Sequence, residues 1–199
     1  ANITCLPSQA DNPCFGFDTG PGNMLMDSWI QKHQQKPYDK NGAWAASSAP
    51  SQELVNQLMK DNFLHQSPPK STGREHYNLS WLENQLKAFP GLENNEIQAS
   101  LCQFTAQSIS ESITRFLPDI STLIVCGGGA HNQNLMQQLE SCLNNTHITT
   151  SEDFGLPADW VEAAAFAWLA KQTLDNHPGN LPEVTGARQS VVLGAIFPA

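Results

Sequence analysis

The first forty residues contain two short apolar runs followed by a helical pattern. The runs cover residues 3–6 and 14–17, and a segment dense in turn-forming residues, 7–13, separates them. This arrangement predicts a β-hairpin-like opening. From Asn23 onward, apolar residues recur at helical spacing, so we expect a helix directly after the second strand, with Asn23 as its N-cap.

The middle of the chain alternates between helical and strand patterns. Residues 95–117 predict a long core helix with one apolar face, formed by Ile97, Leu101, Phe104, Ile109, Ile113 and Phe116. The apolar, β-branched run 121–126 is typical of a strand covered on both faces, and three glycines follow it. A second helix, with Leu135, Met136, Leu139 and Leu143 facing inward, and a strand at 147–150 complete a strand–loop–helix–strand order.

The C-terminal region predicts a helix that begins near Pro157, a residue suited to the first helical position. Its stripe of small and apolar residues indicates close packing on a sheet; it consists of Val161, Ala164, Ala165, Trp168 and Leu169. The apolar tail 191–199 is expected to end the domain. Strands alternating with helices indicate an α/β domain in two or three layers.

Two segments, 36–50 and 64–80, are rich in Pro, Gly, Ser and Lys and predict long loops, with a short helix at 52–59 between them. Long irregular segments are uncommon in a compact domain unless they serve a function. We therefore interpret both as binding loops or lids.

Composition narrows the class of protein. The 199 residues carry 10 Lys and Arg against 19 Asp and Glu, a formal net charge of −9, and 40% of them are hydrophobic. The chain is too apolar for disorder, and no apolar run approaches the roughly 20 residues of a membrane span. A negative surface repels phosphate backbones and anionic lipids, which argues against nucleic-acid and membrane partners. A nucleotide would have to be bound locally, by backbone amides, helix N-termini and Mg²⁺.

The cysteines and histidines suggest a protein without structural metal or disulfides. Five cysteines with no Cys-x-x-Cys pair indicate reduced, buried thiols, and the six histidines lack the spacing of a zinc site. The chain shows no export signal, and its first residues look like the middle of a β-strand. We expect a cytoplasmic protein.

The strongest candidate for chemistry is the segment 17–23, Phe-Asp-Thr-Gly-Pro-Gly-Asn, where an acid stands between an apolar strand and a helix. Ligands of α/β proteins bind at such strand ends. Gly20 and Gly22 permit a backbone path that directs amides at an anion, so the loop is suited to phosphate. Asp18 would serve as general base or as magnesium ligand. The alternative is a turn aspartate that only caps the helix.

A second candidate is the bend Gly127-Gly128-Gly129, followed by Ala130, His131 and Asn132. A backbone without side chains permits close contact with adenine or ribose, and the pattern matches neither a Walker loop nor a Rossmann fingerprint. The alternative is a tight strand-to-helix turn without a ligand. For His131 we favour a capping role.

Two further groups of polar residues remain open. Asp159 and Glu162 lie in a predicted first helical turn, where stabilisation of the helix dipole alone would explain them. Residues 68–75 include Lys70, Ser71, Thr72 and Arg74, and resemble a clamp for a substrate anion. A solvated surface loop is the alternative there.

Five segments in order resemble the anhydro-N-acetylmuramic acid kinase family: 16–23, 70–75, 125–132, 157–163 and 179–187, with the match reaching the terminal 194–199. The resemblance implies an actin-like ATPase fold of the hexokinase and heat-shock-protein-70 superfamily. Its domains are ribonuclease-H-like, each a mixed sheet flanked by helices. Residues 1–199 would form the C-terminal nucleotide-binding domain, and the N-terminal domain would be absent from this chain.

The resemblance also implies an activity. The family consumes ATP and water to open the 1,6-anhydro ring of anhydro-N-acetylmuramic acid and to phosphorylate O6, giving N-acetylmuramic acid 6-phosphate in peptidoglycan recycling. Asp18 matches the catalytic base and Glu162 a substrate-contacting acid. The phosphates and Mg²⁺ would be approached by Thr19, Gly20, Gly22 and Asn23. The family's adenosine motif corresponds to Gly127, Gly128, Gly129 and Asn132. The loop that would face the cleft contains Lys70, Ser71, Thr72 and Arg74.

The resemblance further implies the absent domain and a homodimer as partners. It leaves the isolated chain with half an active site, so we expect no turnover from it alone. Two alternatives stay open: a superfamily kinase for another sugar, and a non-catalytic module that binds nucleotide or forms dimers.

Overall fold

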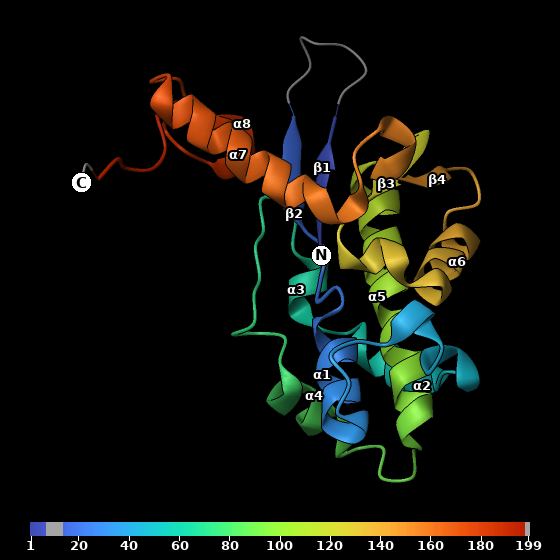
Figure 1. Cartoon of the computed structure of the whole chain (residues 1–199). Coiled ribbons are helices and arrows are strands. Elements are labelled where there is room, and N and C mark those ends of the chain that lie inside the picture. The colour runs from blue at the N-terminus through green and yellow to red at the C-terminus, as the bar shows by residue number, and fades with distance from the viewer. Residues whose placement is uncertain (7–13, 198–199) are drawn as a thin grey trace.

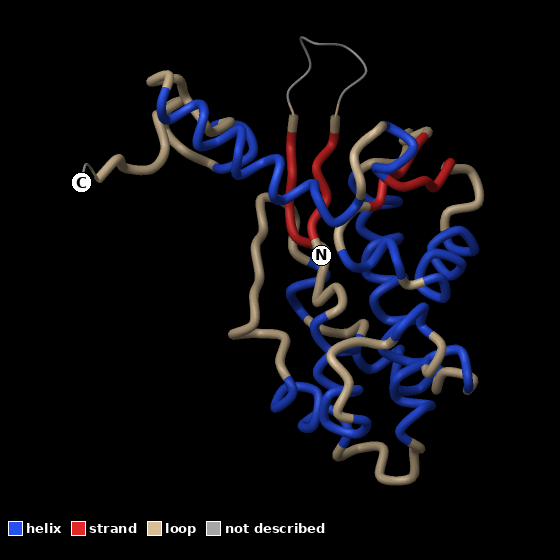
Figure 2. The backbone as a smooth tube through the Cα atoms, viewed as in Figure 1, coloured by secondary structure: helices blue, strands red, loops and turns tan. Residues whose placement is uncertain are grey.

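The structure is a computed structural model, and it describes residues 1–6 and 14–197. It contains four short strands and a set of helices gathered around one long helix (Figures 1 and 2). The strands are β1 (Asn2–Cys5), β2 (Phe15–Asp18), β3 (Thr122–Val125) and β4 (His147–Thr150). The helices are α1 (Met24–Gln34), α2 (Gln52–Leu58), α3 (Asn62–His65), α4 (Leu79–Leu86), α5 (Asn94–Phe116), α6 (Gln133–Cys142), α7 (Val161–Leu174) and α8 (Pro182–Thr185).

Helix α5 organises the body, as its apolar pattern predicts. Helices α1, α2 and α6 pack against it, and its side chains Leu101 and Phe104 are fully buried. The main core is apolar and combines residues from both halves of the chain, including Leu25, Trp29, Leu54, Leu58, Tyr77, Leu82, Leu101, Phe104, Leu135 and Leu139. Burial of this many large side chains is the chief stabilising term of the fold.

Side-chain caps set the start of several helices. Ser51, Asp61, Asn78 and Asn132 each accept a hydrogen bond from a backbone N–H in the first turn of α2, α3, α4 and α6. Asn23 is the N-cap residue of α1, as predicted, although its side chain makes no capping hydrogen bond.

The strands form two separate two-stranded sheets within the described residues. Strands β1 and β2 are antiparallel, with Ile3 opposite Phe17, and β3 and β4 are parallel around α6. An α/β class is confirmed, whereas the single mixed sheet that we expected is not present in these parts of the chain. The predicted hairpin turn 7–13 lies outside the described residues.

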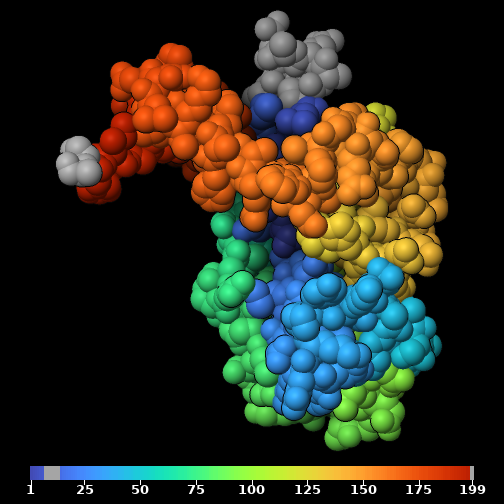
Figure 3. All heavy atoms as spheres, in the orientation of Figure 1, coloured from blue at the N-terminus to red at the C-terminus, as the bar shows by residue number. Residues whose placement is uncertain are grey.

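Strand β3 and helix α7 are less covered than their apolar patterns predict. Side chains along β3 alternate between exposed and half-buried, and Ile124 is 40% exposed. No residue of α7 is buried, so the predicted packing of this helix on a sheet is wrong for this chain. Helices α7 and α8 form an arm that stands out from the body (Figures 1 and 3). Helix α8 contacts β2, but large apolar side chains of α7, such as Phe166 and Trp168, are exposed.

The predicted loops and thiols also differ in part. Segment 36–50 contains two 3₁₀ turns (Lys40–Gly42 and Ala45–Ser47), and the ends of segment 64–80 belong to α3 and α4. Of the five cysteines, only Cys102 is buried, so the expectation of buried thiols is wrong for the others. All five cysteines are free thiols in the structure.

Candidate functional site

The loop between β2 and α1 is fixed firmly on the body. Thr19 is fully buried, and the hydroxyl of Thr105 on α5 donates to the carbonyl of Gly22 at 2.9 Å. Gly22 has a φ of +59°, a left-handed conformation that favours glycine. The sequence Gly-Pro-Gly therefore allows the chain to turn from the strand directly into the helix.

Asp18 is the last residue of β2, and the loop after α3 holds its carboxylate. One oxygen, Oδ2, accepts hydrogen bonds from the Ser71 hydroxyl at 2.9 Å and from the Thr72 backbone N–H at 2.8 Å. In residues 1–6 and 14–197, no donor reaches the other oxygen, Oδ1. The carboxylate is thus oriented through one oxygen and left with a free lone pair on the other.

Lys70 anchors this loop from beneath. Its side chain is 7% exposed, and the ammonium donates to the carbonyls of Phe63 at 3.1 Å and Leu64 at 3.0 Å. Burial lowers the pKa of Lys70 and Arg115 lowers it further, while Asp18 opposes both. The backbone carbonyl of Lys70 also accepts the N–H of Asp18 at 3.0 Å.

The residues of the loop that we expected to face the cleft, 70–74, therefore have different roles. Ser71 and Thr72 meet Asp18, whereas the Lys70 ammonium is committed to the C-terminal carbonyls of α3. Arg74 is exposed and lines neither of the cavities described below. The Thr72 hydroxyl is buried without a hydrogen-bond partner among the described residues, which leaves a polar group open to a ligand beside Asp18.

The triple-glycine bend adjoins the loop that starts at Asp18. Gly127 has a φ of +73° and donates its N–H to the carbonyl of Ala158 at 3.0 Å. A Cβ atom added to Gly128 or Gly129 would lie 3.6 or 3.5 Å from the side-chain amide of Asn23. Asn23 therefore connects two segments more than a hundred residues apart in sequence.

The residues after the bend have structural partners. Asn132 is 8% exposed, and its side chain caps α6 by accepting the N–H of Leu135 at 3.0 Å. A ring nitrogen of His131 lies 2.9 Å from a carboxylate oxygen of Asp159, so the capping role that we favoured for His131 is wrong. This pair ties the bend to the segment before α7.

A cavity of about 490 Å³ opens at this junction. Several parts of the chain line it. Asn23 and Asp27 come from the start of α1, and Asp39 from the segment 38–41. Gly128, His131 and Asn132 come from the glycine bend and the residues after it, and Asp159 from the segment before α7. Asp18 does not line it, so the acid and the bend are neighbours around Asn23 and do not share one cavity wall.

Sequence reasoning missed Asp27, which is the carboxylate of α1 inside this cavity. Desolvation by burial, with the nearby Asp39 carboxylate adding to it, raises the pKa of Asp27 to about 6. A signal was present, because Asp27 follows Asn23 by four residues and so shares its helical face. Glu162, by contrast, is exposed in the first turn of α7 and lines neither cavity. Its substrate contact stays a prediction.

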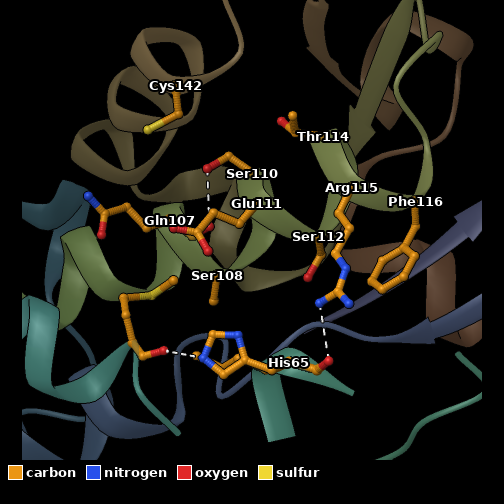
Figure 4. Close-up of a pocket in the computed structure, with 12 residues that line it drawn as sticks. His65, Gln107, Ser108, Ser110, Glu111, Ser112, Thr114, Arg115, Phe116 and Cys142 are labelled. Atoms are coloured by element: carbon orange, nitrogen blue, oxygen red, sulfur yellow. Dashed lines mark hydrogen bonds between the residues drawn. The ribbon is translucent and has the colours of Figure 1, made fainter. Parts of the chain in front are cut away.

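A second cavity, of about 460 Å³, lies beside the C-terminal half of α5 (Figure 4). Two of its polar side chains are bonded to the chain itself: Arg115 donates to the carbonyl of His65 at 3.1 Å, and Ser110 to that of Gln107 at 3.1 Å. None of the site residues predicted from the sequence lines it. We therefore place the candidate site at the Asp18 loop and the glycine bend.

The residues of the site fit Mg²⁺ only together with a phosphate ligand. Within the described residues, no group of three or more His, Cys, Asp or Glu side chains could hold a metal ion. Proteins usually bind Mg²⁺ through one or two carboxylates plus substrate phosphates. Asp18, beside the bare loop at Gly20 and Gly22, offers one such carboxylate.

No helix in the described parts of the chain is long and apolar enough to cross a membrane.

Comparison with known proteins gives one consistent answer. The family model described as anhydro-N-acetylmuramic acid kinase matches residues 1–199. Proteins named anhydro-N-acetylmuramic acid kinase are similar to this chain: that of Coxiella burnetii (strain RSA 493 / Nine Mile phase I) is 46% identical over 197 residues, 99% of this chain and 53% of the relative. Those of Thiobacillus denitrificans and Pseudomonas syringae pv. tomato are 48% identical over 200 and 199 residues, 100% of this chain and 53% and 54% of the relatives.

The chain thus spans about half the length of the curated relatives it matches. The match extends over the Asp18 loop and the glycine bend, which are the two segments that the structure brings together. The family expected from the five motifs is confirmed. The chain belongs to the anhydro-N-acetylmuramic acid kinase family.

Proposed function

We propose that this chain is the C-terminal, nucleotide-binding half of a kinase that acts on 1,6-anhydro-N-acetylmuramic acid. With ATP and water as co-substrates, the whole protein opens the anhydro ring and phosphorylates O6. The supporting observation is the carboxylate of Asp18, held by Ser71 and Thr72 on a glycine loop that adjoins the triple-glycine bend. A ribonuclease-H-like fold for the whole domain belongs to the same proposal.

The proposed reaction combines opening of the anhydro ring by water with phosphoryl transfer to O6. A water oxygen attacks C1 of the sugar and the bond from C1 to O6 breaks. The released O6 attacks the γ-phosphorus, and ADP leaves. Asp18 accepts the proton of the attacking water, and the products are N-acetylmuramic acid 6-phosphate and ADP. Phosphoryl transfer depends mostly on positioning and charge neutralisation, which is the role of a preorganised loop.

Each group at Asp18 has a defined part in this scheme. The two hydrogen bonds to Oδ2 fix the orientation of the carboxylate, while Oδ1 is free to take the proton. The backbone at Gly20 and Gly22 and the N-terminus of α1 would face the phosphates, because helix N-termini favour anions. Bound Mg²⁺ would neutralise phosphate charge, and phosphate oxygens and water would supply most of its ligands, because Oδ1 of Asp18 is assigned to the proton.

The glycine bend would hold the adenosine part of ATP. Gly128 and Gly129 present backbone without side chains, and the 490 Å³ cavity opens directly beside Gly128. The other half of the protein would supply the remaining contacts. We therefore expect the 199-residue chain alone to show weak Mg-ATP binding and no turnover, since a shared cleft divides the contacts needed for affinity.

The test uses the full-length protein that contains this chain. Asp18→Asn keeps the size of the side chain but removes its basicity, and we expect a loss of about 100- to 10,000-fold in kcat for phosphorylation of the anhydro sugar. Asp119→Asn, a change at an exposed carboxylate outside both cavities, is the matched control and should leave kcat unchanged. Normal turnover by Asp18→Asn would refute the base assignment, and preference of the parent enzyme for an unstrained hexose would refute the substrate.

A further inference from the structure

Asp27 is a carboxylate that lines a cavity and has no hydrogen-bond or ion-pair partner within the described residues. It lies on α1 one helical turn after Asn23 and lines the 490 Å³ cavity with Gly128. Its side chain is half-buried, and in residues 1–6 and 14–197 it accepts no hydrogen bond and forms no ion pair. The carboxylate is therefore available to accept hydrogen bonds from a ligand that enters the cavity.

The other acids of the cavity are already engaged. Asp39 accepts hydrogen bonds from the N–H groups of Trp44 and Ala45, each at 2.9 Å, and from the amide of Gln98 at 3.3 Å. Asp159 is paired with His131. Lys40 also lines the cavity, and no bond joins it to Asp27 in the described parts of the chain. Among the acids that line this cavity, Asp27 is therefore the one that has no hydrogen-bond or ion-pair partner within the described residues.

The sign of the charge limits what Asp27 can bind. A carboxylate repels the phosphates of a nucleotide, and it accepts hydrogen bonds from hydroxyl or amino groups. Gly128 lines the same cavity with backbone that carries no side chain, so a sugar or base can approach it closely. Of the nucleoside's donors, the two neighbouring ribose hydroxyls suit a carboxylate best, because its two oxygens can accept both.

We propose that Asp27 accepts a hydrogen bond from a ribose hydroxyl of the bound nucleotide and thereby selects ribonucleotides over deoxyribonucleotides. The inference rests on the proposed function, since it assigns a contact within the same nucleotide site. It adds a specificity-determining residue that the five motifs do not include.

The test compares nucleotides in the full-length protein. For the parent enzyme, we expect kcat/KM to fall about 10- to 100-fold when ATP is replaced by 2′-deoxy-ATP or 3′-deoxy-ATP, as a lost hydrogen bond to a charged group requires. In Asp27→Ala, the ratio between ATP and the deoxy analogue should approach one, because ATP alone loses the contact. Asp119→Asn should keep the discrimination of the parent enzyme.

Other outcomes overturn the proposal. If Asp27→Ala retains the discrimination, or if the parent enzyme shows none, Asp27 does not bind the ribose. If the variant instead loses a preference for ATP over inosine triphosphate, the acceptor serves the amino group of the base and the ribose assignment is wrong. Loss of activity with every nucleotide in the parent enzyme would refute the proposed function itself, so the two failures are separate.

The pH dependence gives an independent measurement. The ionised form of Asp27 is the stronger acceptor, and it forms as pH rises through about 6. The ratio of kcat/KM for ATP between the parent enzyme and Asp27→Asn should therefore increase between pH 5 and 7. The charged and titratable groups that line the cavity with Asp27 are Asp39, Lys40, His131 and Asp159, and all four are present in both proteins. A ratio independent of pH would contradict the proposal.

Discussion

Helices α5 and α7 are both rich in apolar residues, but this chain buries only one of them. On α5, Leu101 and Phe104 are fully buried against three neighbouring helices. On α7, residues 163–170 are all apolar, and yet Phe166 is 70% and Trp168 52% exposed. Other elements surround α5, which buries polar as well as apolar side chains, whereas residues 163–170 of α7 are apolar on every side and lack such neighbours among the described residues.

The difference shows that apolar content stabilises a chain only where the same chain supplies the facing surface. A helix that is hydrophobic all round is normally buried, and a large exposed apolar patch normally marks a contact surface. Substitutions in the two helices should therefore have very different effects on the 199-residue chain. The following measurements, ordered by expected effect, test that contrast.

Phe104→Ala should have the largest effect on stability. The substitution removes a fully buried ring from the main core, and such changes typically lower the free energy of unfolding by about 3–5 kcal/mol. Urea denaturation of the parent chain and the variant measures the difference. A loss below about 1 kcal/mol would mean that α5 is not the centre of the fold.

Asn132→Ala should have an intermediate effect, because it removes the cap of α6 and leaves the N–H of Leu135 unpaired in a buried position. We expect a loss of about 1–2 kcal/mol in the free energy of unfolding. Asn132→Asp restores an acceptor of the same shape and is the matched control. If both variants destabilise equally, the capping bond is not the cause.

Asp27→Asn should stabilise the chain slightly, and only at higher pH. The folded pKa of Asp27, about 6, lies above the ordinary value of 3.8, so ionisation between these pH values costs the folded state free energy. Allowing for solvent screening of a half-exposed group, the variant should gain about 1 kcal/mol at pH 8 and nothing below about pH 4. Denaturation curves at both pH values test the sign. An equal gain at both would exclude titration as its origin.

Phe166→Ser should have the smallest effect on the 199-residue chain, below about 0.5 kcal/mol, because the ring contributes little buried area there. The same substitution in the full-length protein sharpens the comparison. A loss above about 2 kcal/mol there would show that α7 is covered in the whole protein, and an unchanged stability would show that the arm is exposed in both.

The sequence predicted the elements better than their contacts. Helix α5 and the order of β3, α6 and β4 follow from periodicity, because each pattern is satisfied by local spacing and by neighbours in this chain. The covering of β3 and the packing of α7 could not be predicted, since an apolar pattern states that a surface needs a partner but does not identify it.

The site shows the same limit. Asp18 and Ser71 were singled out separately, but only the structure shows the bond between them, 53 residues apart. Asp27 carried no motif, because a single acid on an amphipathic helix is common on protein surfaces. Its importance comes from the segment 38–41 and the glycine bend, which lie far from it in sequence and close in space.

Lys70 gives the loop at Asp18 a chemical reporter. Because its ammonium is enclosed by α3 and the aromatic rings of Phe17 and Phe63, reagents that acylate amines cannot reach it while the loop is closed. The lowered pKa of Lys70 arises mainly from this burial, so it belongs to the closed loop, and opening exposes an ordinary lysine amine to the reagent. The rate of acylation of Lys70, followed by mass spectrometry, therefore measures how often the loop that holds the Asp18 carboxylate opens.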